Sequence, residues 1–228
     1  IIIIKIHTHP YIMIYISWDI GTKNLAYSII DYSDHIVDEK FEDDKLTVYV
    51  KKKTTIIDFD LINLVDLYNS THMDTQAKKQ AKTKANSREK TKLSINEVSI
   101  VLLQFLENKF YLFRHCNVIF IENQPSFINP RTKTLSIIIY SFFIQKTLQN
   151  IQKVNYLYSD VKLVSPLKKI PGVYEKLSYG KLKKLSISIV TNYMQSDPYS
   201  SYKLSTYKKK DDITDCIMYI LVHLKLVC

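Results

Sequence analysis

The sequence predicts an α/β fold in which a mixed β-sheet carries helices on both of its faces. Two observations support this fold class. The first half of the chain is rich in strand patterns, whereas the second half alternates helix and strand patterns. With 228 residues, the chain is also long enough for one substantial domain with its own hydrophobic core.

The first two strands are expected to form a hairpin. Residues 13–21 (MIYISWDIG) are rich in β-branched and aromatic side chains, which is typical of a buried strand. Residues 25–32 repeat this pattern after a short turn, and the spacing favours a β-hairpin. Residues 35–44 can supply a third strand with a charged edge, while residues 46–68 favour neither helix nor strand.

A lysine-rich segment follows at about residues 69–92. It is polar and has no apolar periodicity, so it is expected to be a mobile insertion or a solvated helix. A role as a solvated spacer is favoured over a role as a DNA-contacting arm.

A capping pattern marks the start of the next helix, expected at residues 94–110. Ser94 and Glu97 have the spacing of a capping box, in which each side chain accepts a hydrogen bond from the backbone of the other residue. The apolar stripe behind this start comprises Ile100, Val101, Leu103 and Leu106.

The second half of the chain alternates strands and helices. Residues 117–125 predict a buried strand that ends in Gln-Pro, and residues 132–150 predict a long apolar helix. The remaining expected elements are a strand within 153–166, an amphipathic helix at 178–194, a Ser/Tyr-rich loop at 196–206 and a final helix at 211–226.

The helix expected at residues 132–150 is apolar around nearly its whole circumference. A surface helix needs only one apolar stripe, so the sheet can cover one side and a second element must cover the other. A two-fold partner is favoured, with Tyr140 and Phe143 at the interface. The alternative is that the helix at 94–110 covers the second side within one chain.

The charge of the chain is compatible with a nucleic-acid partner. Lys and Arg number 32 against 22 Asp and Glu, which gives a net charge of +10. However, nearly all of the basic residues are Lys, and the heavy use of Ile, Lys, Tyr and Asn is typical of an AT-rich coding sequence. Charge alone therefore does not decide in favour of nucleic acid.

The cysteines and the opening segment bear on location. Cys116, Cys216 and Cys228 have neither metal-binding nor disulfide-framework spacing, which favours a reducing, intracellular compartment. Residues 1–12 are apolar but interrupted, so no membrane span or signal peptide is expected there. Because Met13 opens the first clear strand, residues 1–12 are interpreted as an upstream extension and residues 13–228 as a single domain.

Four acidic residues stand in positions that exposure to solvent does not explain. Asp19 and Glu122 each end an otherwise apolar strand, and Asp212 and Asp215 share one helix face because they are three residues apart. Each one alone has an ordinary explanation, such as a turn, an ion pair or a favourable charge at a helix start. Buried together they would repel one another, and a divalent cation such as Mg²⁺, which prefers oxygen ligands, removes that cost.

The order of these motifs resembles the Holliday junction resolvases of poxviruses and related large DNA viruses, in the RuvC-like branch of the ribonuclease H-like superfamily. The resemblance covers residues 13–31 and about 117–222. The lysine-rich stretch at about 40–93 is longer than the family leads one to expect. The segments that carry the resemblance are SWDIGTKNLAYSIIDY, IFIENQP, VSP, SYGKLKKLSI and KKKDDITDCI.

The resemblance implies a ribonuclease H-like fold with a mixed sheet of five strands, and a homodimer. It implies a branched DNA substrate such as a four-way junction, cut by symmetric paired nicks, and two Mg²⁺ per active site, for which Mn²⁺ can substitute. If the chain is viral, its expected location is the host cytoplasm. The catalytic and metal-binding acids carried over from the family are Asp19, Glu122, Asp212 and Asp215.

The family also has a functional lysine before the last helix. In SYGKLKKLS, the candidates are Lys181, Lys183 and Lys184, with Lys184 preferred and Lys183 second. Asp211 is adjacent to the matched acids but lies about 100° away from Asp212 around the helix. It is therefore expected to be a cap or a supporting acid rather than a metal ligand.

Two other functions remain open. One is a nuclease of the same fold that cuts flaps or RNA–DNA hybrids, and the other is a non-catalytic DNA-binding subunit with structural acids. A metal-dependent cleavage assay on junction, flap and hybrid substrates distinguishes them.

Overall fold

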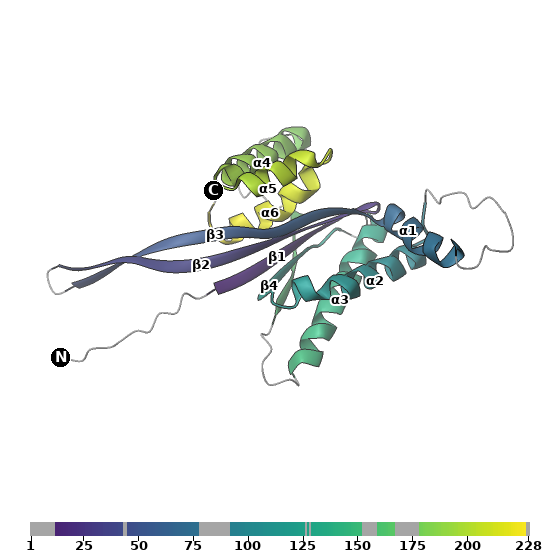
Figure 1. Cartoon of the computed structure of the whole chain (residues 1–228), viewed down its shortest axis with the longest axis horizontal. Coiled ribbons are helices and arrows are strands. Elements are labelled where there is room, and N and C mark those ends of the chain that lie inside the picture. The colour runs from purple at the N-terminus through teal and green to yellow at the C-terminus, as the bar shows by residue number, and fades with distance from the viewer. Residues whose placement is uncertain are drawn as a thin grey trace.

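A mixed five-stranded sheet lies at the centre of the fold, as predicted, with the strand order β3-β2-β1-β4-β5 (Figure 1). β1 (Ile12–Ile20), β2 (Asn24–Glu42) and β3 (Lys45–Asn63) are antiparallel to their sequence neighbours. β4 (Val118–Glu122) runs parallel to β1, and β5 (Asp160–Val164) runs parallel to β4. This computed structural model describes residues 12–42, 45–77, 92–125, 127, 129–151, 159–166 and 178–226.

Three helices cover one face of the sheet: α1 (Leu64–Ala77), α2 (Ile95–Phe113) and α3 (Pro130–Ile151) (Figure 1). The core on this side is built around Trp18, which is fully buried. Its ring centroid lies 5.1 Å from that of Phe113 on α2 and 6.0 Å from that of Phe143 on α3. The same indole therefore fixes two helices to β1.

The other face is covered by α4 (Tyr179–Tyr193), the short 3₁₀ helix η2 (Met194–Ser196), α5 (Pro198–Thr206) and α6 (Asp211–His223) (Figure 1). α6 packs on this face through fully buried side chains, among them Ile213, Ile217, Ile220 and Leu221. Burying each of them stabilises the fold by about 1.5–3 kcal/mol. This packing places the first turn of α6, with its acids, against the sheet.

Several elements agree with the sequence-based expectations. The hairpin is β1–β2, and the strands expected at 117–125 and within 153–166 are β4 and β5. The helices expected at 178–194 and 211–226 are α4 and α6. The capping box at the start of α2 is also confirmed, because Ser94 and Glu97 exchange hydrogen bonds between side chain and backbone.

The third strand differs from the prediction. Residues 35–42 continue β2, and β3 runs from Lys45 to Asn63, through most of the segment that favoured neither helix nor strand. Beyond the end of the β1 pairing at Ser33, β2 and β3 pair only with each other, among the residues described (Figure 1). A two-stranded ribbon has no core behind it, so no buried face imposes an apolar alternation that sequence patterns can detect.

Part of the predicted insertion belongs to a helix. Residues 69–77 lie in α1, which fits the solvated-helix alternative, and residues 78–91 lie outside the described residues. Residues 1–11 also lie outside them, while Ile12 is already the first residue of β1. The assignment of residues 13–228 to a single domain stays a prediction.

The loop expected at residues 196–206 is wrong, because α5 occupies most of it. The Asp197 side chain accepts a hydrogen bond from the backbone N–H of Ser200 at 3.1 Å, and Pro198 occupies the first helical position. Asp-Pro is a helix-start signal in its own right. It was obscured by the polar Ser/Tyr composition of the segment.

The apolar stripe predicted for α2 is only half correct. Val101 and Leu106 are buried, but Ile100 and Leu103 are 54% and 40% exposed. The buried face instead follows the helical spacing of Val98, Val101, Leu102, Phe105 and Leu106.

α3 is also covered more fully than predicted. Phe143 is 2% exposed, so it belongs to the core and is not available to a partner. α2 covers part of the second side, through a ring contact between Phe110 and Phe142 at 5.9 Å and an ion pair between Lys146 and Glu107 at 2.8 Å. Ile137 and Leu148 remain 40% and 60% exposed, and the homodimer stays a prediction.

No helix in the described ranges is long and apolar enough to cross a membrane. Cys116 and Cys216 are buried free thiols, and Cys228 lies outside the described residues.

Candidate active site

Asp19 and Glu122 lie at the same end of two adjacent parallel strands. Trp18 on β1 pairs with Ile121 on β4, so the next residue of each strand reaches the same level of the sheet. Side chains alternate between faces along a strand. Asp19 therefore shares its face with Tyr15, and Glu122 shares its face with Phe120; both of these belong to the core beneath α6.

Glu122 is almost completely buried, with 2% of its surface exposed. Its Oε1 accepts a hydrogen bond from the side-chain amide of Gln124, two residues further on. A carboxylate at this depth lowers the stability of the fold, because removing it from water is unfavourable unless compensating contacts are made.

The acids of α6 complete the arrangement from above the sheet. Asp211 and Asp212 occupy the first turn of the helix, and half-buried Asp215 follows on the same side as Asp212. Asp212 pairs with Lys209, while Asp211 pairs with Lys183 of α4. The adjacent acids thus have different partners, as the 100° step between them predicts.

The pKa of Asp212 is raised above its ordinary value. Burial is the main cause, and the negative charges of Asp19 and Asp211 add to it against the opposing hydrogen bond and charge of Lys209. This influence of Asp19 shows that the end of β1 and the start of α6 lie within electrostatic reach of each other.

The pKa of Asp211 is lowered. Burial alone would raise it, but the hydrogen bond and positive charge of Lys183, together with the charge of Lys209, outweigh burial. The pKa values of two neighbouring carboxylates are therefore shifted in opposite directions. The ionised form is disfavoured for Asp212, the one on which the charge of Asp19 acts.

The donor set suits a hard divalent cation. All four sequence-predicted ligands are carboxylates, and they come from β1, β4 and α6 at one end of one face of the sheet. In the described part of the chain, however, no three His, Cys, Asp or Glu side chains are already placed to hold a metal together. Lys209 and Gln124 engage two of the acids, so binding a cation requires these carboxylates to exchange partners.

Two solved structures share this fold. The fowlpox virus resolvase, determined with its substrate Holliday junction DNA, aligns over 94% of this chain and 98% of its own, with a TM-score of 0.51 and 18% sequence identity. The yeast mitochondrial Holliday junction resolvase aligns over 93% of this chain and 81% of its own, with a TM-score of 0.52 and 17% identity. The chain has the ribonuclease H-like fold of these resolvases. Its sequence matches no family model and no curated protein.

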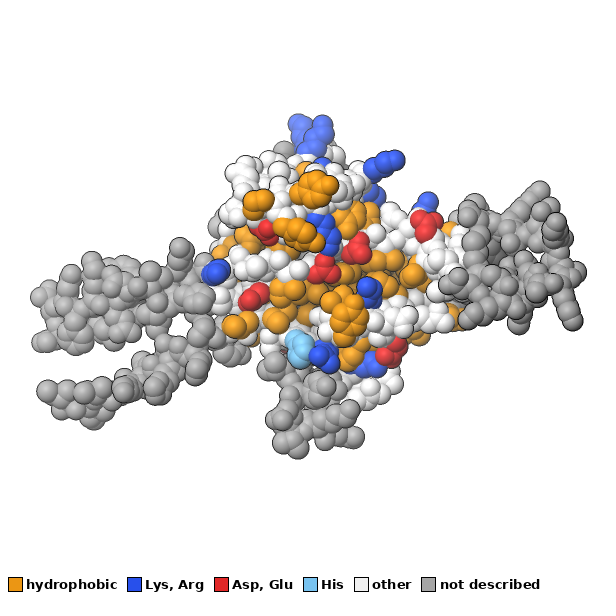
Figure 2. Space-filling view, in the orientation of Figure 1, with side chains coloured by type: hydrophobic (Ala, Val, Ile, Leu, Met, Phe, Trp, Pro, Cys, Tyr) orange, Lys and Arg blue, Asp and Glu red, His pale blue; other side chains and the backbone are white. Residues whose placement is uncertain are grey.

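Of the three candidate lysines before the last helix, Lys183 is the one that pairs with an acid of α6. Its ammonium pairs with Asp211, and its side chain is 30% exposed. Lys184, the residue preferred from sequence, is exposed, and so is Lys181. On the face seen in Figure 2, basic side chains gather over α4 and α5, on the same side of the sheet as the acids.

The loop after Glu122 holds residues that the sequence analysis did not assign to the functional site. A cavity of about 410 Å³ opens beside it, lined by Asn123, Gln124, Pro125, Phe127, Lys133, Ser165 and Pro166. Phe127 is 87% exposed, and Lys133 donates a hydrogen bond to Asn123. The Asn-Gln-Pro sequence at a strand end was the available signal, since it stops the strand and turns the chain beside the buried acid.

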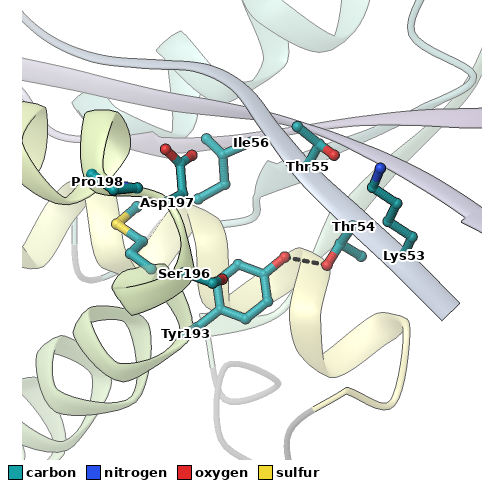
Figure 3. A pocket seen from close by; sticks show the side chains of 9 residues that line it. Lys53, Thr54, Thr55, Ile56, Tyr193, Ser196, Asp197 and Pro198 are labelled. Atoms are coloured by element: carbon teal, nitrogen blue, oxygen red, sulfur yellow. Dashed lines mark hydrogen bonds between the residues drawn. The ribbon is translucent and has the colours of Figure 1, made fainter.

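A second large cavity, of about 450 Å³, lies away from the acids (Figure 3). It sits between β3 and the junction of α4 with α5, where the Tyr193 hydroxyl donates a hydrogen bond to Thr54. Asp197 lines it, but its carboxylate is committed to capping α5. This cavity is therefore not part of the acidic site.

Proposed function

We propose that the chain is a divalent-metal-dependent endonuclease that resolves four-way DNA junctions by symmetric paired nicks. The observation that carries the proposal is the placement of Asp19 and Glu122 at adjacent strand ends, facing the acidic start of α6. The fold supports it, because the two similar solved structures are both Holliday junction resolvases.

In the proposed site, Asp19, Glu122, Asp212 and Asp215 would hold two Mg²⁺ ions, for which Mn²⁺ could substitute. Bound ions of this kind supply an activated water and a stabilised leaving oxygen for hydrolysis of a phosphodiester. Burial and the negative charges of Asp19 and Asp211 disfavour the ionised form of Asp212, and a cation held between these carboxylates would offset their repulsion.

The lysines near the acids have two tasks in this proposal. Lys183 and Lys209 balance the negative charge of Asp211 and Asp212 before substrate arrives. Ammonium groups at these positions can also contact the phosphate backbone of bound DNA, and such contacts position DNA without reading its sequence. Lys183 replaces Lys184 as the favoured functional lysine.

The paired nicks require two active sites related by two-fold symmetry, so the proposal includes a homodimer. The exposed apolar side chains of α3, Ile137 and Leu148, support an interface on that helix.

The test is cleavage of a synthetic four-way junction with Mg²⁺ or Mn²⁺, beside flap and RNA–DNA hybrid substrates. The wild type should cut the junction at symmetric positions, and Asp19→Asn should lower the rate by orders of magnitude while still binding the junction in Ca²⁺. Preferential cutting of flaps or hybrids would assign another nuclease activity to the fold. Binding with no cleavage under any metal would leave a DNA-binding subunit.

A further inference from the structure

A small basic cavity lies at the same end of the sheet as the acids, beside the turn that follows β1. Its volume is about 140 Å³, and its polar lining consists of Thr22, Lys23, Lys92 and Arg131. Among the described residues that line it, none is acidic. Its apolar floor belongs to the core beneath α1, α2 and α3 and comprises Val65, Leu93 and Val98.

The turn that forms one wall of the basic cavity is held in place. The Gly21 N–H donates to the carbonyl of Asn24 at 2.8 Å, and a Cβ on Gly21 would lie 2.8 Å from that same oxygen. The Leu64 N–H donates to the carbonyl of Lys23 at 2.9 Å, which ties the turn to the first residue of α1. Thr22 and Lys23 are therefore presented from a fixed backbone.

The surroundings of the basic cavity favour an anion. The N-terminal ends of α1, α2 and α3 all adjoin it, and the partial positive charge of each helix start adds to the three cationic side chains. The acids next to the lining residues in sequence are Asp66 and Glu97. Glu97 is held by its capping box and by the Tyr68 hydroxyl at 3.0 Å, and Asp66 is exposed.

The cationic groups have hydrogen-bonding capacity to spare. One terminal nitrogen of Arg131 donates to the carbonyl of Leu93, but its buried Nε–H has no acceptor among the described residues. Among the residues that the structure describes, neither the Lys23 ammonium nor the Lys92 ammonium forms an ion pair or a hydrogen bond. Buried N–H groups without an acceptor are uncommon, and an anion in the cavity would supply one.

We propose that the basic cavity binds one backbone phosphate of the DNA strand that is cut. This proposal rests on the proposed nuclease function. Thr22 follows Asp19 by only three residues, but the acids lie on the face of the sheet beneath α6 and the basic cavity opens on the face beneath α1, α2 and α3, so a strand that contacts both sites passes around this end of the sheet. The bound phosphate therefore belongs to a nucleotide near the scissile one, and the cavity sets how the strand crosses the acids.

The test uses Lys23→Gln/Lys92→Gln, since both lysines are exposed and their loss should leave the fold intact, which thermal unfolding checks. Lys109→Gln/Lys225→Gln removes the same charge elsewhere. Lys109 is about 20 Å along α2 from the cavity end of that helix, and Lys225 follows α6. Single phosphates of a synthetic junction are replaced in turn by neutral methylphosphonates, and binding is measured in Ca²⁺.

The wild type and the control variant should lose affinity about tenfold at one position near the cut, as loss of a hydrogen bond to a charged group predicts. The Lys23→Gln/Lys92→Gln variant should bind the unmodified junction more weakly and be insensitive at that position. Its salt-dependence slope should also fall by about 0.9, because the variant neutralises one phosphate fewer.

Junction cleavage by the wild type with the same methylphosphonate profile in all three proteins would overturn the cavity assignment and leave the nuclease proposal standing. A separate readout is the unfolding temperature in inorganic phosphate. If phosphate stabilises the wild type but not the Lys23→Gln/Lys92→Gln variant, while no junction is bound or cut, the cavity is an anion site but its assignment to DNA fails together with the nuclease proposal.

Discussion

Asp211 and Asp212 are neighbours in the chain, yet their pKa values are shifted in opposite directions. Burial and the charge of Asp19 raise the pKa of Asp212, whereas Lys183 and Lys209 outweigh burial and lower the pKa of Asp211. A carboxylate with a raised pKa destabilises the folded state when ionised, and one with a lowered pKa stabilises it. The candidate site therefore carries a cost in stability that a bound cation would relieve.

In EDTA at neutral pH, Asp212→Asn should raise the unfolding temperature by a few degrees, and Asp211→Asn should lower it. The cost from Asp212 is complete above its raised folded-state pKa and disappears as the pH falls through that value. The benefit from Asp211 is present above its unfolded-state pKa and is lost as the pH falls through its lowered folded-state pKa. Thermal unfolding as a function of pH measures both, and a less stable Asp212→Asn protein at neutral pH contradicts this account.

Lys183 and Lys184 offer a matched pair of single substitutions. Lys183→Gln removes the cation that pairs with Asp211 and that is proposed to contact the DNA backbone, so cleavage should fall by about 10-fold or more, as loss of a hydrogen bond to a charged group predicts. Lys184→Gln removes the same charge from an exposed position and should change the rate by no more than about twofold. Restoration of the rate by Lys183→Arg would separate the charge from a purely structural role, and equal effects of the two Gln variants would reject it.

Sequence patterns could locate Asp19 and Glu122 because an acid that ends an apolar strand is unusual wherever it occurs. They could not choose between Lys183 and Lys184, since the choice depends on how α4 is rotated about its axis against α6. Sequence patterns could not predict the basic cavity either. Lys23, Lys92 and Arg131 come from three distant segments, and only the packing of α1, α2 and α3 brings them together.

At the scale of elements, α5 and the residue after it bind the edge strand β3 through side-chain hydrogen bonds. The Lys203 ammonium donates to Asp58 of β3 at 2.6 Å, and the hydroxyl of Tyr207, just after α5, donates to Asp60 at 2.8 Å. Tyr27 of β2 donates to the same Asp58 at 2.7 Å. Through these contacts a nine-residue helix, missed in the sequence, joins β3 to the helical layer, beside the hydrogen bond from Tyr193 of α4 to Thr54.

The cap of α5 gives this element a direct test. Asp197→Ala removes the acceptor for the Ser200 N–H and should lower the free energy of unfolding by about 0.5–2 kcal/mol in urea titrations. Asp197→Asn keeps a good capping side chain and should cost much less. A loss of stability that is equal for Ala and Asn would show that the charge of Asp197, and not its capping hydrogen bond, is what matters.

At the scale of the whole molecule, one helix of the α1–α3 layer still exposes apolar side chains. In the α1–α3 layer, α3 keeps an apolar stripe at Ile137, Tyr140, Ile144 and Leu148, with spacings of three and four residues. Ile137 and Leu148 are exposed, and Tyr140 and Ile144 are half-buried. Such a stripe is typical of a helix that packs against another helix.

Ile137→Lys/Leu148→Lys should therefore abolish the proposed dimer without unfolding the chain, because both side chains already contact solvent. Phe143→Lys is unsuitable, since Phe143 is in the core and its loss would destabilise the monomer by several kcal/mol. Ile57→Lys/Tyr202→Lys, at sites that are 50% and 72% exposed on other elements, adds the same charge as a control.

Sedimentation should show a dimer for the wild type and the control and a monomer for the α3 variant. Because paired nicks need two active sites, the monomer should nick a junction without a coupled second cut. A folded α3 variant that stays dimeric would move the interface to another surface, and a wild type that is monomeric while still making coupled cuts would remove the need for a dimer.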